Sequence, residues 1–86
     1  MYESLGLEYK IRWTEDRLNS AQKSIAFWET KEASLRQEYG DNPAWWQCAH
    51  IRKVKQNRKS AQADLVYWTN ELESLRNKLS IYRLFS

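Results

Sequence analysis

Helix-breaking residues are scarce in this chain of 86 residues, and two of the three stand together near its middle. The only proline is Pro43, and Gly40, one of two glycines, precedes it by three positions. Glycine suits the left-handed conformation that ends many helices, and proline is tolerated in a helix's first turn. Long breaker-free stretches on both sides of one short turn predict two long helices that run antiparallel as neighbours. The expected fold class is therefore all-α, an antiparallel helical hairpin.

The expected hairpin occupies the whole chain as a single domain, residues 1–86, because a chain of this length forms one domain. We expect the first helix over about residues 4–39, the turn over 40–43 and the second helix over about 43–82. Gly40 would end the first helix. Asn42 would cap the second helix with its side-chain oxygen, and Pro43 would occupy the first turn.

Apolar residues recur at alternating steps of four and three on both sides of the turn, as in a coiled-coil seam. The first helix places on its seam Leu7, Ile11, Thr14, Leu18, Ala21, Ile25, Trp28, Glu32, Leu35 and Tyr39. The second helix places on its seam Ile51, Val54, Arg58, Ala61, Leu65, Trp68, Leu72, Leu75, Leu79 and Tyr82. A charge at a seam position is costly unless it is paired. Arg58 is therefore expected to extend to solvent or to meet an acidic side chain of a second hairpin.

Leu7–Trp13 admits a second interpretation. Its apolar and polar residues alternate with a period of two, which is typical of a half-buried strand. Thr14 and the two acidic residues after it would then form the first turn of a helix that begins later. Such a strand would need a partner, either residues 81–85 or a second chain. The helical seam runs through the same residues, and we favour the helix.

An internal repeat with an offset of 40 residues links the two helices. The matching segments are Ser20-Ala21-Gln22 with Ser60-Ala61-Gln62, Phe27-Trp28 with Tyr67-Trp68, and Ser34-Leu35-Arg36 with Ser74-Leu75-Arg76. In the expected hairpin, seam position i faces roughly position 82 minus i. Ala21 would then face Ala61 across a local two-fold axis. The repeat records either a duplication or the chance recurrence of common residues in two amphipathic helices.

The aromatic content exceeds what a two-helix seam can cover, since the chain has five Trp and five Tyr. Small folds commonly need a disulfide, a metal or a partner subunit. One cysteine and one histidine leave neither a disulfide within the chain nor a structural metal as an option. We therefore expect two hairpins to dimerise into a four-helix bundle. The expected core and dimer residues are Ile25, Phe27, Trp28, Arg58, Leu65, Tyr67 and Trp68.

Positive charge gathers just after the turn. The net charge is +3, yet residues 41–60 alone hold five Lys/Arg and one Asp, a net charge of +4. Trp45 and Trp46 lie about 100° apart on a helix, so one can pack over the tip while the other faces a partner. We predict that a partner is bound by Trp45, Trp46, His50, Arg52, Lys53, Lys55 and Lys59.

Catalysis finds little support in the sequence. His50 is the only histidine, and it follows Cys48 by two residues. On a helix this separation turns the two side chains about 200° apart, which does not suit a catalytic pair. We expect Cys48 to be a small interior thiol and His50 to lie at the edge of solvent. No enzymatic activity, cofactor or metal is expected.

These observations favour a small protein-interaction module, such as an adaptor or an inhibitor that binds and blocks a host protein, of the type that phages and mobile elements encode. The alternative is a nucleic-acid-binding regulator that uses the basic segment 50–59 on a phosphate backbone. A lone thiol indicates a reducing compartment, most simply the cytoplasm of a cell or of an infected host. The sequence shows neither a signal peptide nor an apolar run of about 20 residues, so no membrane partner is expected.

Overall fold

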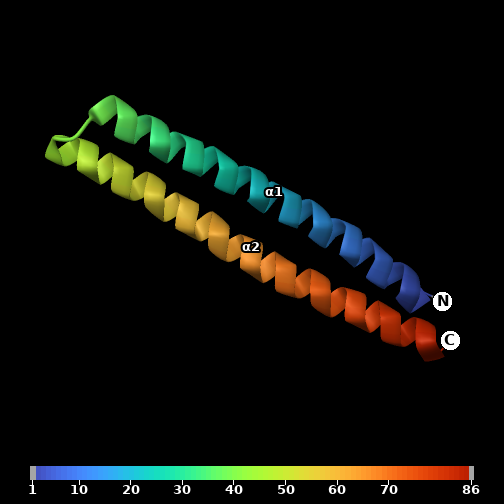
Figure 1. Cartoon of the computed structure of the whole chain (residues 1–86). Helices are drawn as coiled ribbons and strands as arrows, with labels where there is room; N and C mark the ends of the chain where they lie inside the picture. Colours follow the sequence, from blue (N-terminus) through green and yellow to red (C-terminus); the bar gives the residue numbers. More distant parts are fainter. Residues whose placement is uncertain (1, 86) are drawn as a thin grey trace.

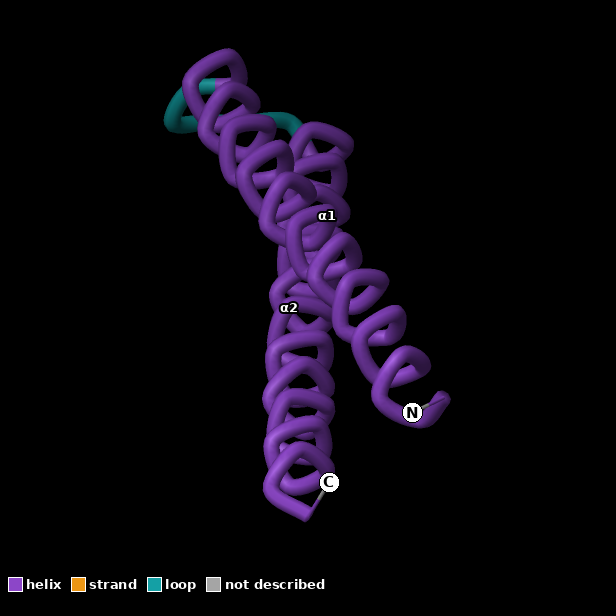
Figure 2. The backbone as a smooth tube through the Cα atoms, turned by 90° about the vertical axis from the view of Figure 1, so that its right-hand side faces the viewer, coloured by secondary structure: helices purple, strands orange, loops and turns teal. Residues whose placement is uncertain are grey.

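A computed structural model describes the backbone of residues 2–85 and the side chains of residues 5–85. Helix α1 spans Tyr2–Tyr39 and helix α2 spans Trp45–Phe85. The helices run antiparallel over an extended molecule of 64 × 14 × 13 Å, with the turn at one end and both chain ends at the other (Figure 1). Seen from the side, they cross and diverge toward the open end (Figure 2). The predicted all-α antiparallel hairpin is confirmed, and the strand interpretation of residues 7–13 is wrong.

The predicted seam is also confirmed, because all twenty of its positions are buried or half-buried. The buried apolar side chains are Ala21, Leu35, Val54, Ala61, Leu72, Leu75 and Leu79. Thr14 is only 1% exposed, and its hydroxyl donates to the carbonyl of Lys10 at 2.7 Å. This bond satisfies the hydroxyl within its own helix, so the polar interruption is tolerated. The core is thus one row of side chains between two helices.

Gly40 ends α1 as predicted. Its φ is +72°, and its N–H donates to the carbonyl of Arg36 at 3.2 Å. This is the left-handed helix ending in which a glycine avoids the strain that a Cβ would bring.

The start of α2 differs from the prediction. The N–H of Cys48 donates to the carbonyl of Ala44 at 3.0 Å, so Ala44 is the capping residue and α2 begins at Trp45. The N–H of Ala44 donates to Oε1 of Gln47 at 2.7 Å, which is the reaching-back half of a capping box. The predicted Asn42 cap is therefore wrong, because Gln47 supplies the acceptor and Pro43 lies ahead of the helix. The helices also extend beyond the predicted limits at their open ends.

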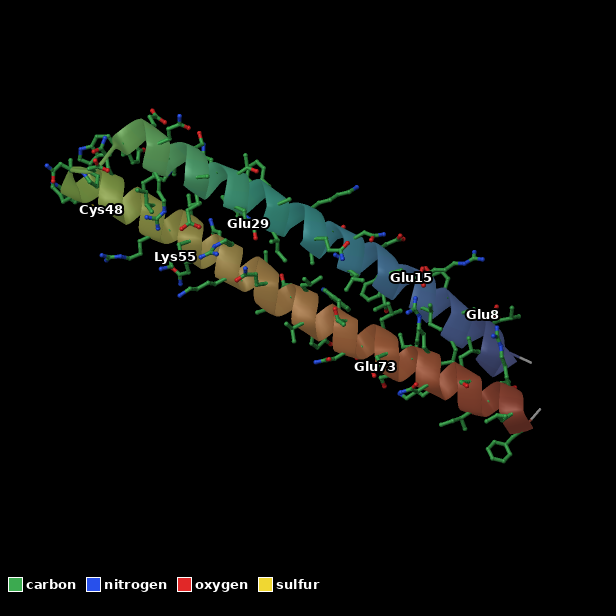
Figure 3. All side chains as sticks on the ribbon, in the orientation of Figure 1. Glu8, Glu15, Glu29, Cys48, Lys55 and Glu73 are labelled. Atoms are coloured by element: carbon green, nitrogen blue, oxygen red, sulfur yellow. The ribbon has the colours of Figure 1, made fainter. Side chains whose placement is uncertain are left out.

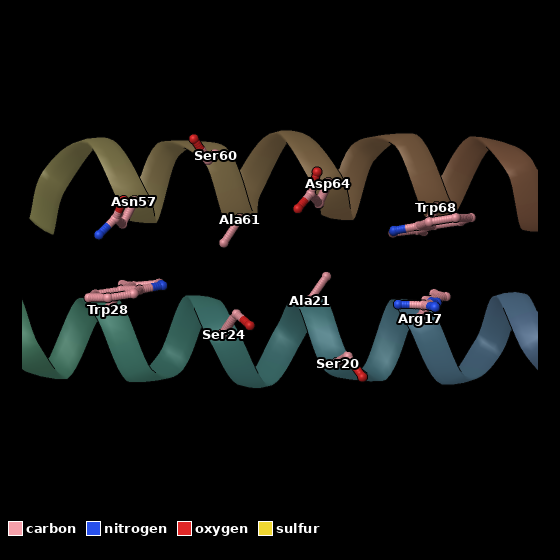
Figure 4. A pocket seen from close by; sticks show the side chains of 10 residues that line it. All are labelled: Arg17, Ser20, Ala21, Ser24, Trp28, Asn57, Ser60, Ala61, Asp64 and Trp68. Atoms are coloured by element: carbon pink, nitrogen blue, oxygen red, sulfur yellow. The ribbon is translucent and has the colours of Figure 1, made fainter. Parts of the chain in front are cut away.

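The longer turn changes the register between the helices. Trp28 lies opposite Asn57, and Trp68 lies opposite Arg17 (Figure 4). In each facing pair the residue numbers add to about 85, where the predicted register gave about 82. The difference of about one helical turn follows from α2 beginning two residues later than expected.

We expect Gly40→Ala to lower the free energy of unfolding by about 1 kcal/mol, because an L residue is strained at positive φ. Nothing lies within 4 Å of a Cβ built at Gly40, so the effect would come from the backbone alone. Gly6 in α1 is a matched control, since it is equally uncrowded and has no positive φ. Gly6→Ala should stabilise slightly, because alanine favours helix. Urea unfolding of both variants at one protein concentration checks this, and equal effects would contradict it.

Candidate functional site

Exposed aromatic side chains gather on one long face of the hairpin. Phe27 follows Trp13 by two heptads and Tyr67 follows Trp46 by three, so each pair lies on the same side of its helix. Trp13 and Tyr67 line one groove of about 500 Å³, which places the two stripes on the same side of the molecule. These four side chains are 45–59% exposed. We call this surface the aromatic face, made of Trp13, Phe27, Trp28, Trp46, Tyr67 and Trp68.

The two aromatic dipeptides of the internal repeat adopt the same geometry. The rings of Phe27 and Trp28 meet edge to face at 4.9 Å and 81°, and those of Tyr67 and Trp68 at 4.8 Å and 80°. The two Trp rings are half-buried on the seam, while Phe27 and Tyr67 remain 59% and 58% exposed. A single hairpin therefore leaves the outer ring of each dipeptide in water. The structure supports partner binding to this extent, because many large apolar side chains are exposed.

Small side chains form the waist of the aromatic face. Ala21 and Ala61 each point toward the opposite helix but are staggered along the hairpin, so the predicted direct facing of these two residues is wrong (Figure 4). Because alanine and serine fill little of the space there, a groove of about 370 Å³ remains, with a Trp ring toward each end. Its lining residues are Arg17, Ser20, Ala21, Ser24, Trp28, Asn57, Ser60, Ala61, Asp64 and Trp68. The five lining positions of α2 are the five lining positions of α1 with 40 added to each number. Because the helices run antiparallel, equivalent positions are then related by a local two-fold axis through the waist.

The opposite long face carries ion pairs between the helices. Nη2 of Arg76 lies 3.2 Å from Oε1 of Glu15, and Nη2 of Arg83 lies 3.0 Å from Oε1 of Glu8. Both pairs are substantially exposed, so each contributes little to stability. They lie toward the open end, where Glu8 and Glu15 are labelled, with Cys48 and Lys55 toward the turn (Figure 3). We call this surface the ionic face.

The two charged seam residues pair with each other. Nε of Arg58 lies 3.0 Å from Oε2 of Glu32, and the side chains are 25% and 12% exposed. The N–H is not aligned well enough for a hydrogen bond, so this contact is ionic. Nη2 of Arg36 donates to the other oxygen of Glu32 at 3.0 Å. The acidic partner of Arg58 therefore comes from its own hairpin, not from a second one as one expectation had it.

The predicted partner-binding residues at the tip divide between the two faces. Trp46 meets the ring of Tyr39 edge to face at 5.9 Å, and Nδ1 of His50 lies 2.8 Å from the Tyr39 hydroxyl. Lys53 follows Trp46 by one heptad and belongs to the same side. Trp45 lies on the ionic face instead and is 83% exposed. One of the two adjacent Trp residues thus contacts the tip, and the other stands in solvent.

Trp45 begins a basic stripe on the ionic face. Arg52 and Lys59 follow Trp45 by one and two heptads, and Lys55 lies beside them. With Gln56, the three cations line a shallow surface groove of about 390 Å³. Within residues 5–85 none of these cations takes part in a salt bridge. We call Trp45, Arg52, Lys55 and Lys59 the basic stripe.

Cys48 is exposed, so the prediction of an interior thiol is wrong. Gln47 occupies the position nearest the seam, and this turns Cys48 outward. The thiol lies 3.9 Å from the carbonyl of Pro43, and the His50 ring faces Tyr39, so the two groups have different surroundings. Among the described residues, no group of three or more His, Cys, Asp or Glu is placed to hold a metal ion. Neither helix, over its described length, is long and apolar enough to cross a membrane.

Sequence reasoning missed Trp13 as a surface residue. Its ring meets that of Trp68 edge to face at 5.4 Å, and the guanidinium carbon of Arg17 lies 4.9 Å from its centroid. The signal was the two-heptad spacing between Trp13 and Phe27, which places both in one stripe. Comparisons of the chain with models of protein families, with curated proteins and with solved structures find no match, so the function must be argued from these two faces.

Proposed function

We propose that this hairpin is a non-enzymatic protein-interaction module that pairs with a second copy through its aromatic face. The observation that carries the proposal is the gathering of half-exposed aromatic rings on one side of a chain whose seam buries a single row of side chains. Exposed aromatic rings gathered on one side mark an interaction site in a soluble protein, and here polar side chains line the grooves between the rings. Two hairpins that meet on it form a four-helix bundle, in which Phe27 and Tyr67 become core residues.

The size of the face supports the dimer. One whole side of the hairpin, 64 Å long and 14 Å wide, has a projected area of roughly 900 Å², and a standard interface buries about 800 Å² per partner, so the dimer would use most of that side. Four of the seven predicted core and dimer residues lie on this face, namely Phe27, Trp28, Tyr67 and Trp68. The remaining three belong to the seam of the single hairpin, namely Ile25, Arg58 and Leu65.

The basic stripe is the second half of the proposal. Trp45 is the most exposed Trp among the described side chains, and none of the three cations beside it is in a salt bridge within residues 5–85. An exposed Trp beside cations suits a hot spot that binds an acidic protein surface, with the charges steering the encounter. The module would then act as an adaptor, or as an inhibitor that covers the acidic surface of a target, including a host protein for a phage-type chain.

Binding at the basic stripe is tested with a target captured from host extract, purified and titrated by calorimetry. We expect Trp45→Ser to weaken binding by about 30-fold, since a buried Trp anchor is worth about 2 kcal/mol. Lys55→Glu should weaken it as well. Lys23→Glu is the control, because it makes the same charge change at an exposed site on α1 outside both the aromatic face and the basic stripe. Equal losses in all three variants would remove the basic stripe from the proposal.

The groove lined by Arg52, Lys55 and Lys59 with Gln56 also suits a phosphate backbone, which keeps the nucleic-acid alternative open to test. On the protein-binding proposal, single-stranded RNA and duplex DNA should bind no more tightly than about 10 μM at modest salt. Tighter binding that falls steeply with salt, with a slope that Lys55→Gln flattens, would favour the nucleic-acid regulator instead.

A further inference from the structure

We infer that the two hairpins of the dimer lie with their turns at opposite ends, so that each helix packs against the same helix of the partner. The inference rests on the proposed dimer and adds its arrangement. The local two-fold axis at the waist lies midway between Arg17 and Trp28 on α1 and between Asn57 and Trp68 on α2. A second copy placed on the aromatic face by a dimer two-fold axis through this waist can take two orientations.

The two orientations bring different residues together. With turns at opposite ends, each α1 lies against the partner's α1 and each α2 against the partner's α2. The waist is at about position 22.5 of α1 and 62.5 of α2, so the numbers of two facing residues add to about 45 on the α1 pair and to about 125 on the α2 pair. With turns at the same end, α1 faces the partner's α2 and facing positions add to about 85, as they do within one hairpin.

Charge complementarity favours the turns at opposite ends. Lys10, Glu71 and Lys78 line the aromatic-face groove, and Lys53 lies one heptad before Ser60 of the waist groove. In this orientation Lys53 lies beside the partner's Glu71, and the dimer symmetry makes this contact twice. Lys10 similarly approaches the partner's Glu38. Opposite charges therefore meet on both pairs of helices, while a like-charge approach at the same offset, between the two Asp64 carboxylates of the waist, occurs once.

Cations also meet aromatic rings in this orientation. Lys78 faces the partner's Trp46, and Lys31 faces the partner's Trp13. Trp46 is 53% exposed in the single hairpin, so its ring offers a surface to a cation, whereas the Trp13 ring already meets Arg17 of its own hairpin.

The same-end orientation brings like charges together. Lys31 would face the partner's Lys53, and Lys10 would approach the partner's Lys78. Each repulsion would occur twice and would disfavour the dimer. The opposite-end orientation avoids both contacts. It also places the two basic stripes at the two ends of the bundle, so that one dimer can hold two target molecules at once.

A spin label on Cys48 of the natural chain measures the orientation directly. Cys48 is exposed and lies one heptad before Lys55, on the side away from the aromatic face. It is about 14 residues from the waist on α2, or about 21 Å at about 1.5 Å per residue. Two labels in the opposite-end dimer are therefore about 42 Å apart along the bundle, and its width adds to this, so electron double resonance should show a distance above about 40 Å.

In the same-end dimer the two labels would instead be separated only by the width of a four-helix bundle. Helices in such a bundle pack about 8–10 Å apart, so the labels would lie less than about 30 Å from each other. A distance below about 30 Å would therefore overturn the inference while keeping the dimer. A monomer by light scattering would overturn both.

Charge reversal gives an independent test. Lys53→Glu and Glu71→Lys should each weaken dimerisation by about 5- to 10-fold, since each places two like-charge contacts in the interface. The double reversal should restore the dissociation constant measured by sedimentation equilibrium. Lys23→Glu should leave it unchanged, because Lys23 lies outside the aromatic face. Tighter association of Lys53→Glu would contradict the inference, because that result is expected only when Lys53 faces the partner's Lys31.

Discussion

Replacing Phe27 and Tyr67 together by serine should convert the dimer to a monomer at micromolar concentration. These rings are the outer members of the two aromatic dipeptides, and each is more than half exposed in the single hairpin. In the four-helix dimer each would occur twice, at the centre of the interface. Loss of a buried aromatic side chain commonly costs about 2 kcal/mol or more, so the combined change should weaken dimerisation by about 1000-fold or more. Light scattering on a sizing column gives the mass of the species.

Val66→Ser is the matched control. Val66 is the neighbour of Tyr67 and is 60% exposed, but it lies on the ionic face, one heptad after Lys59. Its loss should leave the mass unchanged. The midpoint of thermal unfolding should rise with protein concentration for the natural chain and for Val66→Ser, and should not depend on concentration for the double variant. A natural chain that stays monomeric at tens of micromolar would disprove the dimer.

Glu32→Ala should lower the free energy of unfolding by about 2 kcal/mol, because it leaves the guanidinium of Arg58 on the seam without its acidic partner. Breaking a fully buried pair costs about 3–5 kcal/mol, and the 25% exposure of Arg58 reduces that penalty. Replacing both residues by methionine should be close to neutral or stabilising, because two apolar side chains of similar length fill the same space without a buried charge. Urea unfolding of the single and double variants measures the coupling.

Arg36→Ala provides the comparison for that cycle. Arg36 also pairs with Glu32, but its side chain is 57% exposed, so its loss should cost less than about 0.5 kcal/mol. If Glu32→Ala costs no more than Arg36→Ala, the Glu32–Arg58 pair does not hold the seam together. A double methionine variant that is much less stable than either single variant would also contradict the argument.

The seam was predictable because it depends on spacing alone. A seven-residue period places each seam position on the helix without knowledge of the partner, and all twenty predicted positions are buried or half-buried. The cap of α2 was not predictable to the same degree. Asn42 and Gln47 both offer a suitable oxygen within a few residues, and which one reaches a free N–H depends on the path of the turn. The two-residue error there changed the register by about one turn.

The division of the candidate site into two faces needed the register of both helices. Trp45 and Trp46 are adjacent, yet the side of the hairpin that each one joins depends on which residue of the first turn lies on the seam. Gln47 takes that position, although Cys48 is the more apolar choice. The aromatic face was within reach of the sequence, because Trp13 and Phe27 share a stripe. Recognising it required following positions beyond the seam itself.

The start of α1 and the end of α2 lie together at one end of the molecule, and the turn lies at the other end of its 64 Å length (Figure 1). A force applied between the two chain ends would load the contacts between the helices one layer at a time from the open end, where the Glu8–Arg83 pair lies beside the seam. Such loading unzips a hairpin, and it requires less force than shearing all layers together. A load applied along a dimer with turns at opposite ends would instead be shared by every layer of the aromatic face. Pairing would thus change a structure that peels apart easily into one that resists extension along its whole length.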